Sequence, residues 1–335
     1  MEYRILGKTG LRVSEIGFGC GNVGGLMVRG TDQEQLEAVK FALKLGINYF
    51  DTAPAYGNGQ SEINLGKVLK QITEDVFVAT KVQIEIEDSK DIKSCVRRSL
   101  ETSLNRLGRE YVDVFQLHTP ISSETGIGGQ NRRLNLEQVL GKNGVVEVFE
   151  AVRAEGMVRF LGFTGLGDTD ALHEVIKSRR FDIVQSYFNL LNPSAGIGVP
   201  VGFKGQDFRQ LINSAAANKM GVVVIRVIAG GALGGPAART GYAASSIGGG
   251  LTPGSEYKDD EVRAGKLGFL FDSDLNSIPQ AAVRFALDNP NVSTVLVGYS
   301  NNAQISEAAA CSGKKPIPES QLERLTRLWA TDFGI

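Results

Sequence analysis

Short hydrophobic runs alternate with longer amphipathic stretches along most of the chain. The clearest short runs, residues 76–79 and 222–225, are unbroken rather than alternating. Unbroken runs of this length are typical of strands buried on both faces, as in a parallel sheet. A β-hairpin over residues 3–6 and 11–14 is predicted before the first of these strands. The pattern predicts eight buried strands, which end near Gly19, Asp51, Thr80, Leu117, Thr164, Ser186, Arg226 and Gly298.

Between the strands, hydrophobic side chains recur every three or four positions, the period of a helix. Thr31 and Glu34 form a capping-box pattern at the start of one such stretch, and Ser277 precedes another that opens with Pro279. Eight strand–helix units predict an α/β fold of the (β/α)8, or TIM-barrel, type with an N-terminal hairpin, in a single domain over residues 1–335. The alternative is an open doubly wound sheet, which more often has a glycine-rich phosphate loop followed at once by a helix.

Three long stretches interrupt the pattern, and each follows the C-terminal end of a predicted strand. They cover residues 119–135, 192–205 and 229–259. Long loops in compact domains are usually functional or disordered, and active sites of barrels lie at this end. The sequence does not determine their conformations. The third stretch is rich in glycine, which predicts a mobile lid over a bound ligand.

Composition and charge exclude several classes of function. The 36 lysines and arginines nearly balance the 37 aspartates and glutamates, so a dense positive field for nucleic acid is absent. No hydrophobic run approaches the ~20 residues of a membrane span, and the first residues lack a signal-peptide layout. With three scattered cysteines and two histidines, neither a disulfide framework nor a metal site is expected. The sequence therefore predicts a cytoplasmic protein without nucleic-acid or membrane partners.

Residues 19–24 match the pattern G-x-G-x-x-G after a predicted strand. A dinucleotide-binding loop of that kind requires a helix that begins at the loop itself. Here the next clear helix cap is Thr31. The motif is interpreted as a flexible loop at the mouth of the first strand, with backbone groups that approach a ligand.

Four polar side chains at consecutive strand ends carry a stronger signal: Asp51, Tyr56, Lys81 and His118. Each has an ordinary structural explanation, namely a turn cap, a loop tyrosine, a solvated strand end and a satisfied core histidine. An acid, a phenol, a cation and an imidazole that follow successive strands of one barrel are instead expected to meet at its mouth.

The chemistry of these four groups is complementary. A phenol with a pKa of about 10 is a poor proton donor at neutral pH, and a nearby ammonium such as Lys81 lowers that pKa. Asp51 supplies the counter-charge that a buried ammonium requires. Tyr56 is then a general acid towards a carbonyl oxygen, and neutral His118 orients the carbonyl. Such a reaction also needs a hydride, which implies a nicotinamide cofactor.

At these residues the sequence resembles the aldo-keto reductase superfamily of NAD(P)-dependent (β/α)8 barrels. The shared signature comprises residues 50–53 with Tyr56 and Gly57, then 61–62, 79–81 and 116–118. The resemblance implies that Tyr56 donates the proton, that Lys81 and Asp51 tune it, and that His118 orients the substrate. It extends over nearly the whole chain.

The resemblance also implies the residues that bind NADP(H) or NAD(H). These are Asp51, Thr164, Gln185, Arg226, Gly230, Gly231, Ser300 and Gln304. Thr164 and Gln185 would meet the carboxamide, and the two glycines would bring backbone amides to the pyrophosphate. Arg226 lies where the family usually has an aromatic residue.

The preference between the two dinucleotides stays open. Ser300 and Gln304 lie where the family holds the adenosine phosphate end, but no lysine or arginine occurs between Gly298 and Gln304. A 2′-phosphate is best bound by a cation, so the absence of one here favours NAD. The usual preference of the family instead favours NADP. Gln304 is equally well explained as an ordinary exposed helix residue.

The predicted function is the interconversion of an aldehyde or ketone, including an aldose sugar, with an alcohol. Its partner is a small carbonyl or alcohol substrate, and the protein is a monomer or a homo-oligomer. Two alternatives remain. One is a non-catalytic nicotinamide sensor, as in potassium-channel β subunits, and the other is a Schiff-base lyase with Lys81 as the nucleophile.

Overall fold

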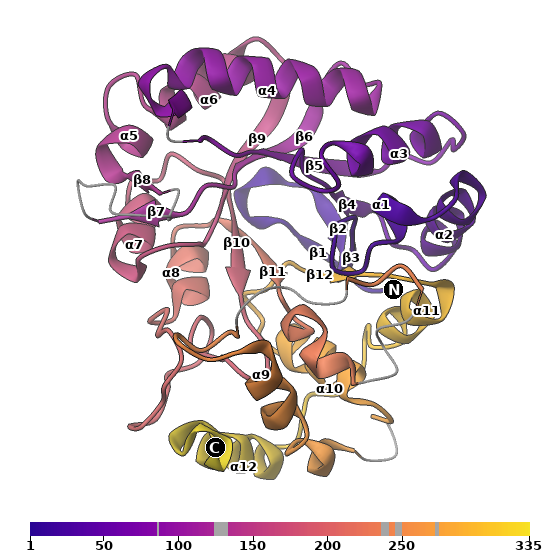
Figure 1. Cartoon of the computed structure of the whole chain (residues 1–335), viewed down its shortest axis with the longest axis vertical. Helices are drawn as coiled ribbons and strands as arrows, with labels where there is room; N and C mark the ends of the chain where they lie inside the picture. The colour runs from indigo at the N-terminus through magenta and orange to yellow at the C-terminus, as the bar shows by residue number, and fades with distance from the viewer. Residues whose placement is uncertain (86, 124–132, 236–240, 245–249, 272–274) are drawn as a thin grey trace.

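A computed structural model describes residues 1–335 except 86, 124–132, 236–240, 245–249 and 272–274. Eight parallel strands close into a barrel, as predicted, and the open doubly wound sheet is excluded (Figure 1). Around the barrel the strands are β3 (Ile16–Gly19), β4 (Tyr49–Asp51), β5 (Phe77–Val82), β6 (Val112–Leu117), β9 (Val158–Thr164), β10 (Ile183–Tyr187), β11 (Gly221–Ile225) and β12 (Thr294–Gly298).

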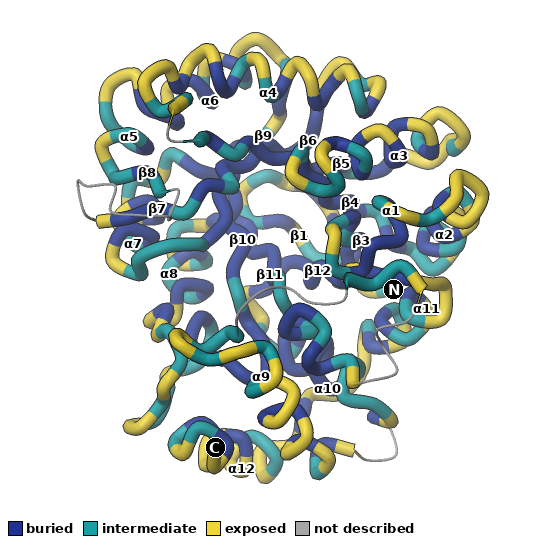
Figure 2. The backbone as a smooth tube through the Cα atoms, viewed as in Figure 1, coloured by how far each residue is buried: buried dark blue, intermediate teal, exposed yellow. Residues whose placement is uncertain are grey.

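A helix on the outside of the barrel follows each strand, and the strands themselves are buried (Figure 2). The predicted helix starts are confirmed. Thr31 and Glu34 form a reciprocal capping box, and the Ser277 side chain accepts from the backbone of Gln280. The helices are α2 (Asp32–Lys44), α3 (Gln60–Leu69), α4 (Ile92–Leu107), α6 (Val145–Ala154), α7 (Thr169–Lys177), α8 (Leu211–Ala217), α10 (Ile278–Leu287) and α11 (Asn302–Ala309).

Strand β5 is longer than the sequence pattern indicated. It continues past Thr80 to Val82, and Lys81 pairs with Gln116 of β6. Lys81 therefore lies within a central strand instead of at a solvated strand end. Its side chain is almost completely buried.

The predicted hairpin closes the N-terminal end of the barrel. Strands β1 (Tyr3–Ile5) and β2 (Arg12–Ser14) pair antiparallel around the 3-10 helix η1 (Gly7–Thr9). Leu6, Leu11 and Val13 pack against side chains from the bottom of the barrel such as Tyr49 and Val114. Gly7 has φ +53°, and a Cβ there would lie 2.1 Å from the backbone nitrogen of Gly221, so only glycine fits this approach.

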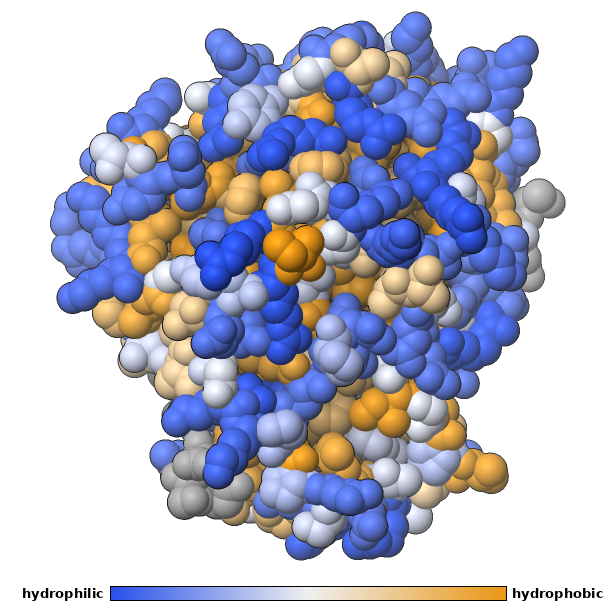
Figure 3. Space-filling view, turned by 180° about the vertical axis from the view of Figure 1, so that it is seen from behind, coloured by the Kyte–Doolittle hydropathy of each residue, from blue (hydrophilic) through white to orange (hydrophobic). Residues whose placement is uncertain are grey.

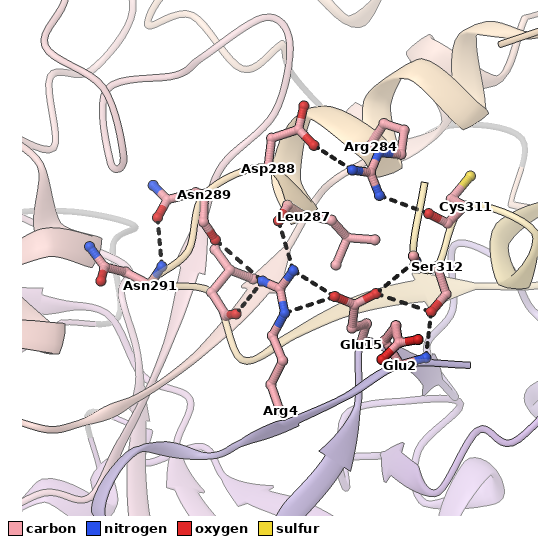
Figure 4. A network of polar contacts seen from close by, with 12 residues as sticks. Glu2, Arg4, Glu15, Arg284, Leu287, Asp288, Asn289, Asn291, Cys311 and Ser312 are labelled. Carbon is pink, nitrogen blue, oxygen red and sulfur yellow. Dashed lines mark hydrogen bonds and ion pairs between the residues drawn. The ribbon is translucent and has the colours of Figure 1, made fainter. Parts of the chain in front are cut away.

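A polar network ties the hairpin to the C-terminal part of the chain (Figure 4). The Arg4 guanidinium pairs with Glu15 at 2.6 Å and donates to the backbone oxygens of Leu287 and Val292. The second oxygen of Glu15 accepts from the Ser312 hydroxyl at 3.0 Å. These contacts satisfy the Leu287 carbonyl at the end of α10 and the Val292 carbonyl beyond it, and they hold the hairpin against the segments that follow α10 and α11.

The glycine motif at residues 19–24 differs from the prediction. A one-turn helix, α1 (Leu26–Arg29), begins directly after Gly25, so the segment is not an unstructured loop up to Thr31. Gly24 packs against the end of β12, where a Cβ would lie 2.3 Å from the backbone nitrogen of Tyr299. The glycine is therefore required by contact with the neighbouring strand.

Two of the three long stretches contain short elements, whereas residues 192–205 form turns without a helix or strand. The first carries β7 (Ile121–Ser122) and β8 (Leu134–Asn135), which leads into α5 (Leu136–Leu140). The third contains the 3-10 helix η3 (Ala229–Gly234) and the start of α9 (Tyr257–Ala264). The predicted mobile lid falls partly at 236–240 and 245–249, and the first loop partly at 124–132, all outside the described residues.

The C-terminal helix α12 (Glu319–Ala330) lies with α9 at one side of the barrel (Figure 1). Its Trp329 indole donates to the backbone oxygen of Leu190, and Arg263 of α9 pairs with Asp332 just beyond the helix. Among the described residues, further 3-10 helices are η2 (Glu87–Lys90), η5 (Gly268–Leu270) and η6 (Asp332–Gly334). On the face seen in Figure 3, hydrophobic residues lie in small groups among hydrophilic ones, which is usual for a protein surface. In the described part of the chain, no helix has the length and hydrophobicity needed to cross a membrane.

Candidate active site

A cleft of about 1280 Å³ opens at the C-terminal ends of the barrel strands. It runs from the ends of β4 and β6 to the start of α11. Lys81 lies beneath its floor. The other sequence-predicted site residues all line it, namely Asp51, Tyr56, His118, Thr164, Gln185, Arg226, Gly230, Gly231, Ser300 and Gln304.

The structure brings the Lys81 ammonium into direct contact with two of the predicted residues. Its Nζ donates to a carboxylate oxygen of Asp51, to the Thr52 backbone oxygen at 2.8 Å and to the Tyr56 hydroxyl at 3.2 Å. All three donor hydrogens of the ammonium are thereby used. Lys81 is 0% exposed and Asp51 is 3% exposed, so this ion pair is shielded from water.

Asp51 also accepts hydrogen bonds from two buried amides. Gln185 Nε2 lies 2.6 Å and Gln116 Nε2 lies 3.2 Å from its second oxygen. Burial raises the pKa of Asp51, while Lys81, Gln185 and Gln116 act in the opposite direction. A carboxyl group that accepts from three donors has the surroundings of an ionised carboxylate.

Gln116 was not among the site residues predicted from the sequence. The signal was its position two residues before His118, which places both side chains on the same face of a strand. Its register partner is Gly162, where a Cβ would lie 2.8 Å from the Gln116 side chain. Gly162 therefore makes the room in which Gln116 reaches Asp51.

The pKa of Tyr56 differs from the expectation. Burial raises the pKa of its phenol above 10, and the lowering effect of Lys81 does not reverse that shift. For Lys81, burial alone would lower the pKa, but Asp51 and Tyr56 keep it above its ordinary value. At neutral pH the pair is therefore a protonated phenol beside an ammonium.

His118 lies edge-on to Tyr56, with ring centroids 6.1 Å apart and an interplanar angle of 88°. Burial, followed by the charges of Lys81 and Arg226, lowers the pKa of His118 to about 3, so the imidazole is neutral. Its ring forms no hydrogen bond with any other described residue, which distinguishes it from a satisfied core histidine. His173, the second histidine of the chain, bonds instead to the Phe208 backbone oxygen at 3.1 Å.

The predicted carboxamide-binding residues are already engaged with the site. Gln185 uses its amide nitrogen on Asp51, and its oxygen lies 3.5 Å from the Thr164 hydroxyl. Both residues are almost completely buried in the floor of the cleft. Their contact with a nicotinamide carboxamide stays a prediction.

At the other end of the cleft, Ser300 and Gln304 form the turn before α11. The Ser300 hydroxyl donates to the Gly24 backbone oxygen, and its backbone nitrogen donates to the Gln304 side chain, each at 2.7 Å. Ser300 is 5% exposed. The Ser300 side chain therefore stabilises the turn. A phosphate at this end of the cleft would be bound by backbone amides and by the more exposed Asn301.

The described parts of the molecule contain no group of three or more histidine, cysteine, aspartate or glutamate side chains arranged to hold an ion. The three cysteines are buried and unpaired.

Comparison with known proteins shows which family the chain matches. A profile of the Aldo/keto reductase family matches residues 15–330. The chain is similar to L-galactose dehydrogenase of Arabidopsis thaliana, with 36% identity over 50% of this chain and 49% of that protein. It therefore spans about half the length of that relative. It is also similar to D-threo-aldose 1-dehydrogenase of Pseudomonas sp, with 28% identity over 90% of each protein.

Among solved structures, the chain is similar to the aldo-keto reductase AKR11C1 from Bacillus halodurans in its holo form. The TM-score is 0.71, and the superposition covers 98% of this chain and 96% of that one. At 23% sequence identity, this similarity concerns the fold.

Proposed function

This chain belongs to the aldo/keto reductase family, and on that premise we propose that it uses a nicotinamide dinucleotide to interconvert a carbonyl compound and an alcohol. The observation that carries the proposal is the contact of Lys81 with both Asp51 and Tyr56 on the floor of one large cleft. His118 completes the group from the neighbouring strand end.

The residues around the cleft fit a nicotinamide dinucleotide. Its volume of about 1280 Å³ exceeds the roughly 300–1,000 Å³ of typical small-ligand sites, which leaves room for an extended ligand. Gly230 and Gly231, with φ of +66° and +106°, line it with bare backbone. The first turn of α11 also borders it, where phosphate oxygens are favoured. A bound nicotinamide supplies or accepts the hydride that no side chain can carry.

The chain's own residues carry out the proton transfer. Tyr56, protonated at neutral pH, gives its proton to the carbonyl oxygen in reduction and takes one from the alcohol in oxidation. The Lys81 ammonium stabilises the phenolate that proton donation leaves, and Asp51 balances the ammonium. Neutral His118 donates a hydrogen bond that orients the substrate oxygen.

The substrate class we propose includes polyhydroxy aldehydes. Support comes from the similarity to D-threo-aldose 1-dehydrogenase, which extends over 90% of both proteins. Both dinucleotides are expected to bind, because residues 298–310 contain no lysine or arginine to select a 2′-phosphate. A cytoplasmic location remains part of the prediction.

The two alternatives fit the site less well. A Schiff-base nucleophile must be a neutral and accessible amine. Lys81 is buried, ion-paired and protonated, so it does not meet that requirement. A nicotinamide sensor needs no proton donor, whereas Tyr56 here contacts both an ammonium and the edge of a neutral imidazole.

Turnover and binding test the proposal separately. Fluorescence titration with NADH and NADPH measures binding, and oxidation of each with simple aldehydes measures turnover. Tyr56→Phe is expected to retain dinucleotide binding and to lower kcat by about 10²–10⁴, the range for loss of general acid catalysis. Lys81→Met should cause similar damage, and the double variant should lose much less than the product of the two losses.

Matched controls are Tyr111→Phe and Lys67→Met, which change an exposed tyrosine and an exposed ion-paired lysine. Both should keep wild-type turnover. Wild-type activity in Tyr56→Phe, or losses that multiply in the double variant, would contradict the mechanism. Binding without turnover would favour the sensor.

A further inference from the structure

One charged side chain at the cleft takes no part in the proton chemistry. Arg226 follows the end of β11, and it is the one cation among the described residues that line the cleft. The acids of the lining are already engaged, since Asp51 pairs with Lys81 and Glu307 accepts from the Ser277 hydroxyl. Among the described residues that line the cleft, the Arg226 guanidinium therefore has no carboxylate partner.

The guanidinium of Arg226 has no polar partner among the described residues. Its charged carbon lies 5.7 Å from the centre of the Tyr187 ring, at the end of the adjacent strand β10. Other sheltered arginines are paired, for example Arg263 with Asp260 and Arg284 with Asp288. A partly buried cation that lacks an anion is costly, so this arrangement favours a negatively charged ligand.

The backbone holds Arg226 in a strained conformation. Its φ is +57°, in the left-handed region, which costs a non-glycine residue on the order of 1 kcal/mol. The Arg226 carbonyl accepts from the buried Asn189 amide at 2.9 Å and from the Ala229 backbone nitrogen at 2.8 Å. The position of the arginine is therefore fixed by its surroundings, as expected for a residue that recognises a ligand.

Two anions would come within reach of this cleft: the diphosphate of the dinucleotide and a carboxylate on the substrate. The segments suited to phosphate are Gly230–Gly231 and the first turn of α11. Arg226 instead lies over Tyr187, and its charge contributes to the lowered pKa of His118. The positive charge of Arg226 therefore acts on the imidazole of His118, the residue proposed to orient the substrate.

We propose that Arg226 binds a carboxylate on the substrate, so that the preferred substrates are carbonyl compounds that carry an acid group, such as aldehyde acids and uronic acids. This inference rests on the proposed function. Bidentate hydrogen bonds from the guanidinium would hold the carboxylate, with Tyr187 as the aromatic support of the cation. Arg226 thus selects the substrate by its charge, while Tyr56 performs the proton transfer.

The test compares 4-formylbenzoate with 4-formylbenzamide, which share the aldehyde, ring and size and differ in charge. The wild type should show a higher kcat/KM for the benzoate. In Arg226→Met the ratio of the two kcat/KM values should fall about 10- to 100-fold, the effect of one charge-assisted contact. Arg226→Lys should keep part of the preference, because the charge remains and the fork geometry is lost.

Arg324→Met serves as the control, because Arg324 also stacks on an aromatic ring, at 4.1 Å from the centre of the Phe269 ring, but is exposed on α12 away from the cleft. Its ratio should equal that of the wild type. Dinucleotide affinity is measured by fluorescence in every variant. An unchanged ratio with weakened dinucleotide binding would assign Arg226 to the diphosphate and overturn the proposal. An unchanged ratio with only a lower Tm would show that Arg226 merely packs on Tyr187, and this result would also overturn the proposal.

The proposed function can fail separately from this inference. If the wild type turns over neither aldehyde, calorimetric binding of the two compounds to the dinucleotide-loaded protein decides the inference. Tighter binding of 4-formylbenzoate that Arg226→Met abolishes supports it, and equal binding contradicts it. Should Arg226→Met fail to fold, Arg226→Lys carries the test, and a ratio identical to that of the wild type contradicts the proposal.

Discussion

Asp51 connects more of the candidate site than any sequence pattern indicated. Its two oxygens accept from Lys81, Gln116 and Gln185, which come from three different strands of the barrel. The carboxylate thereby holds the ammonium beneath the Tyr56 hydroxyl. Substitutions of residues that contact Asp51 should therefore affect the site more than substitutions of residues that are only close to Asp51 in the sequence.

Residue-scale electrostatics also predict how stability depends on pH at His118. The pKa of this imidazole is lowered from 6.5 to about 3 in the folded protein. Its contribution to stability is thus fully present above pH 6.5 and is lost as the pH falls towards 3, because the unfolded chain takes up the proton first. Between pH 7 and pH 4.5 this loss amounts to roughly 2–3 kcal/mol.

Urea unfolding of the wild type and of His118→Gln at both pH values tests this expectation. The variant should lose less stability than the wild type on acidification. His173→Gln, on the outer helix α7, controls for the removal of a histidine. Equal acid losses in the wild type and His118→Gln would show that the imidazole is not sheltered from protonation.

At the scale of elements, the N-terminal hairpin is a plug attached by a few polar contacts. Leu6, Leu11 and Val13 fill the bottom of the barrel, and Arg4 ties the plug to the end of α10 (Figure 4). Because the hairpin lies at the end opposite the cleft, its loss should affect stability before chemistry.

Arg4→Met tests this attachment. The change leaves the Glu15 carboxylate, 5% exposed, without its cation, and it removes the donor of the Leu287 and Val292 carbonyls. We expect a loss of about 2–3 kcal/mol in the free energy of unfolding, with kcat of the folded enzyme unchanged. Denaturant unfolding measures the loss, and Arg12→Met, in the exposed part of the same hairpin, is the control. A stability change no larger than that of Arg12→Met would refute the anchoring function.

At the scale of the whole molecule, the cleft joins segments from both ends of the chain. Residues 19–24 follow the first barrel strand, 229–234 follow the seventh and 298–304 follow the eighth, yet all contribute to one wall. Closing the barrel brings β12 beside β3, which is what makes these segments neighbours.

Hydrogen exchange with and without NADH or NADPH tests this joint wall. Added dinucleotide should slow exchange in 19–24, 229–234 and 298–304 together, because one extended ligand contacts all three. The hairpin at 3–14, at the other end of the barrel, should exchange equally in both states. Protection limited to a single segment, or spread over the hairpin, would contradict the proposed placement of the ligand.

Much of the fold and part of the candidate site were predictable from the sequence. Unbroken hydrophobic runs require strands buried on both faces, and eight of them with helices between leave few arrangements besides a closed barrel. Polar residues at the ends of parallel strands then share one mouth, which is why Asp51, Tyr56 and His118 were found together. These features depend on local period and chain order, and both are written in the sequence.

Only the tertiary structure decided what surrounds each of these groups. Gln185 lies 134 residues from Asp51 along the chain, and no spacing pattern in the sequence predicts the hydrogen bond between them. The direction of the Tyr56 pKa shift depends on how much water the folded barrel excludes, and that exceeded the effect of Lys81. Whether Arg226 has an acid for a partner is likewise a property of all the segments that meet at the mouth. Burial and pairing arise from contacts between distant segments, whereas the sequence alone determines which side chains are present to make them.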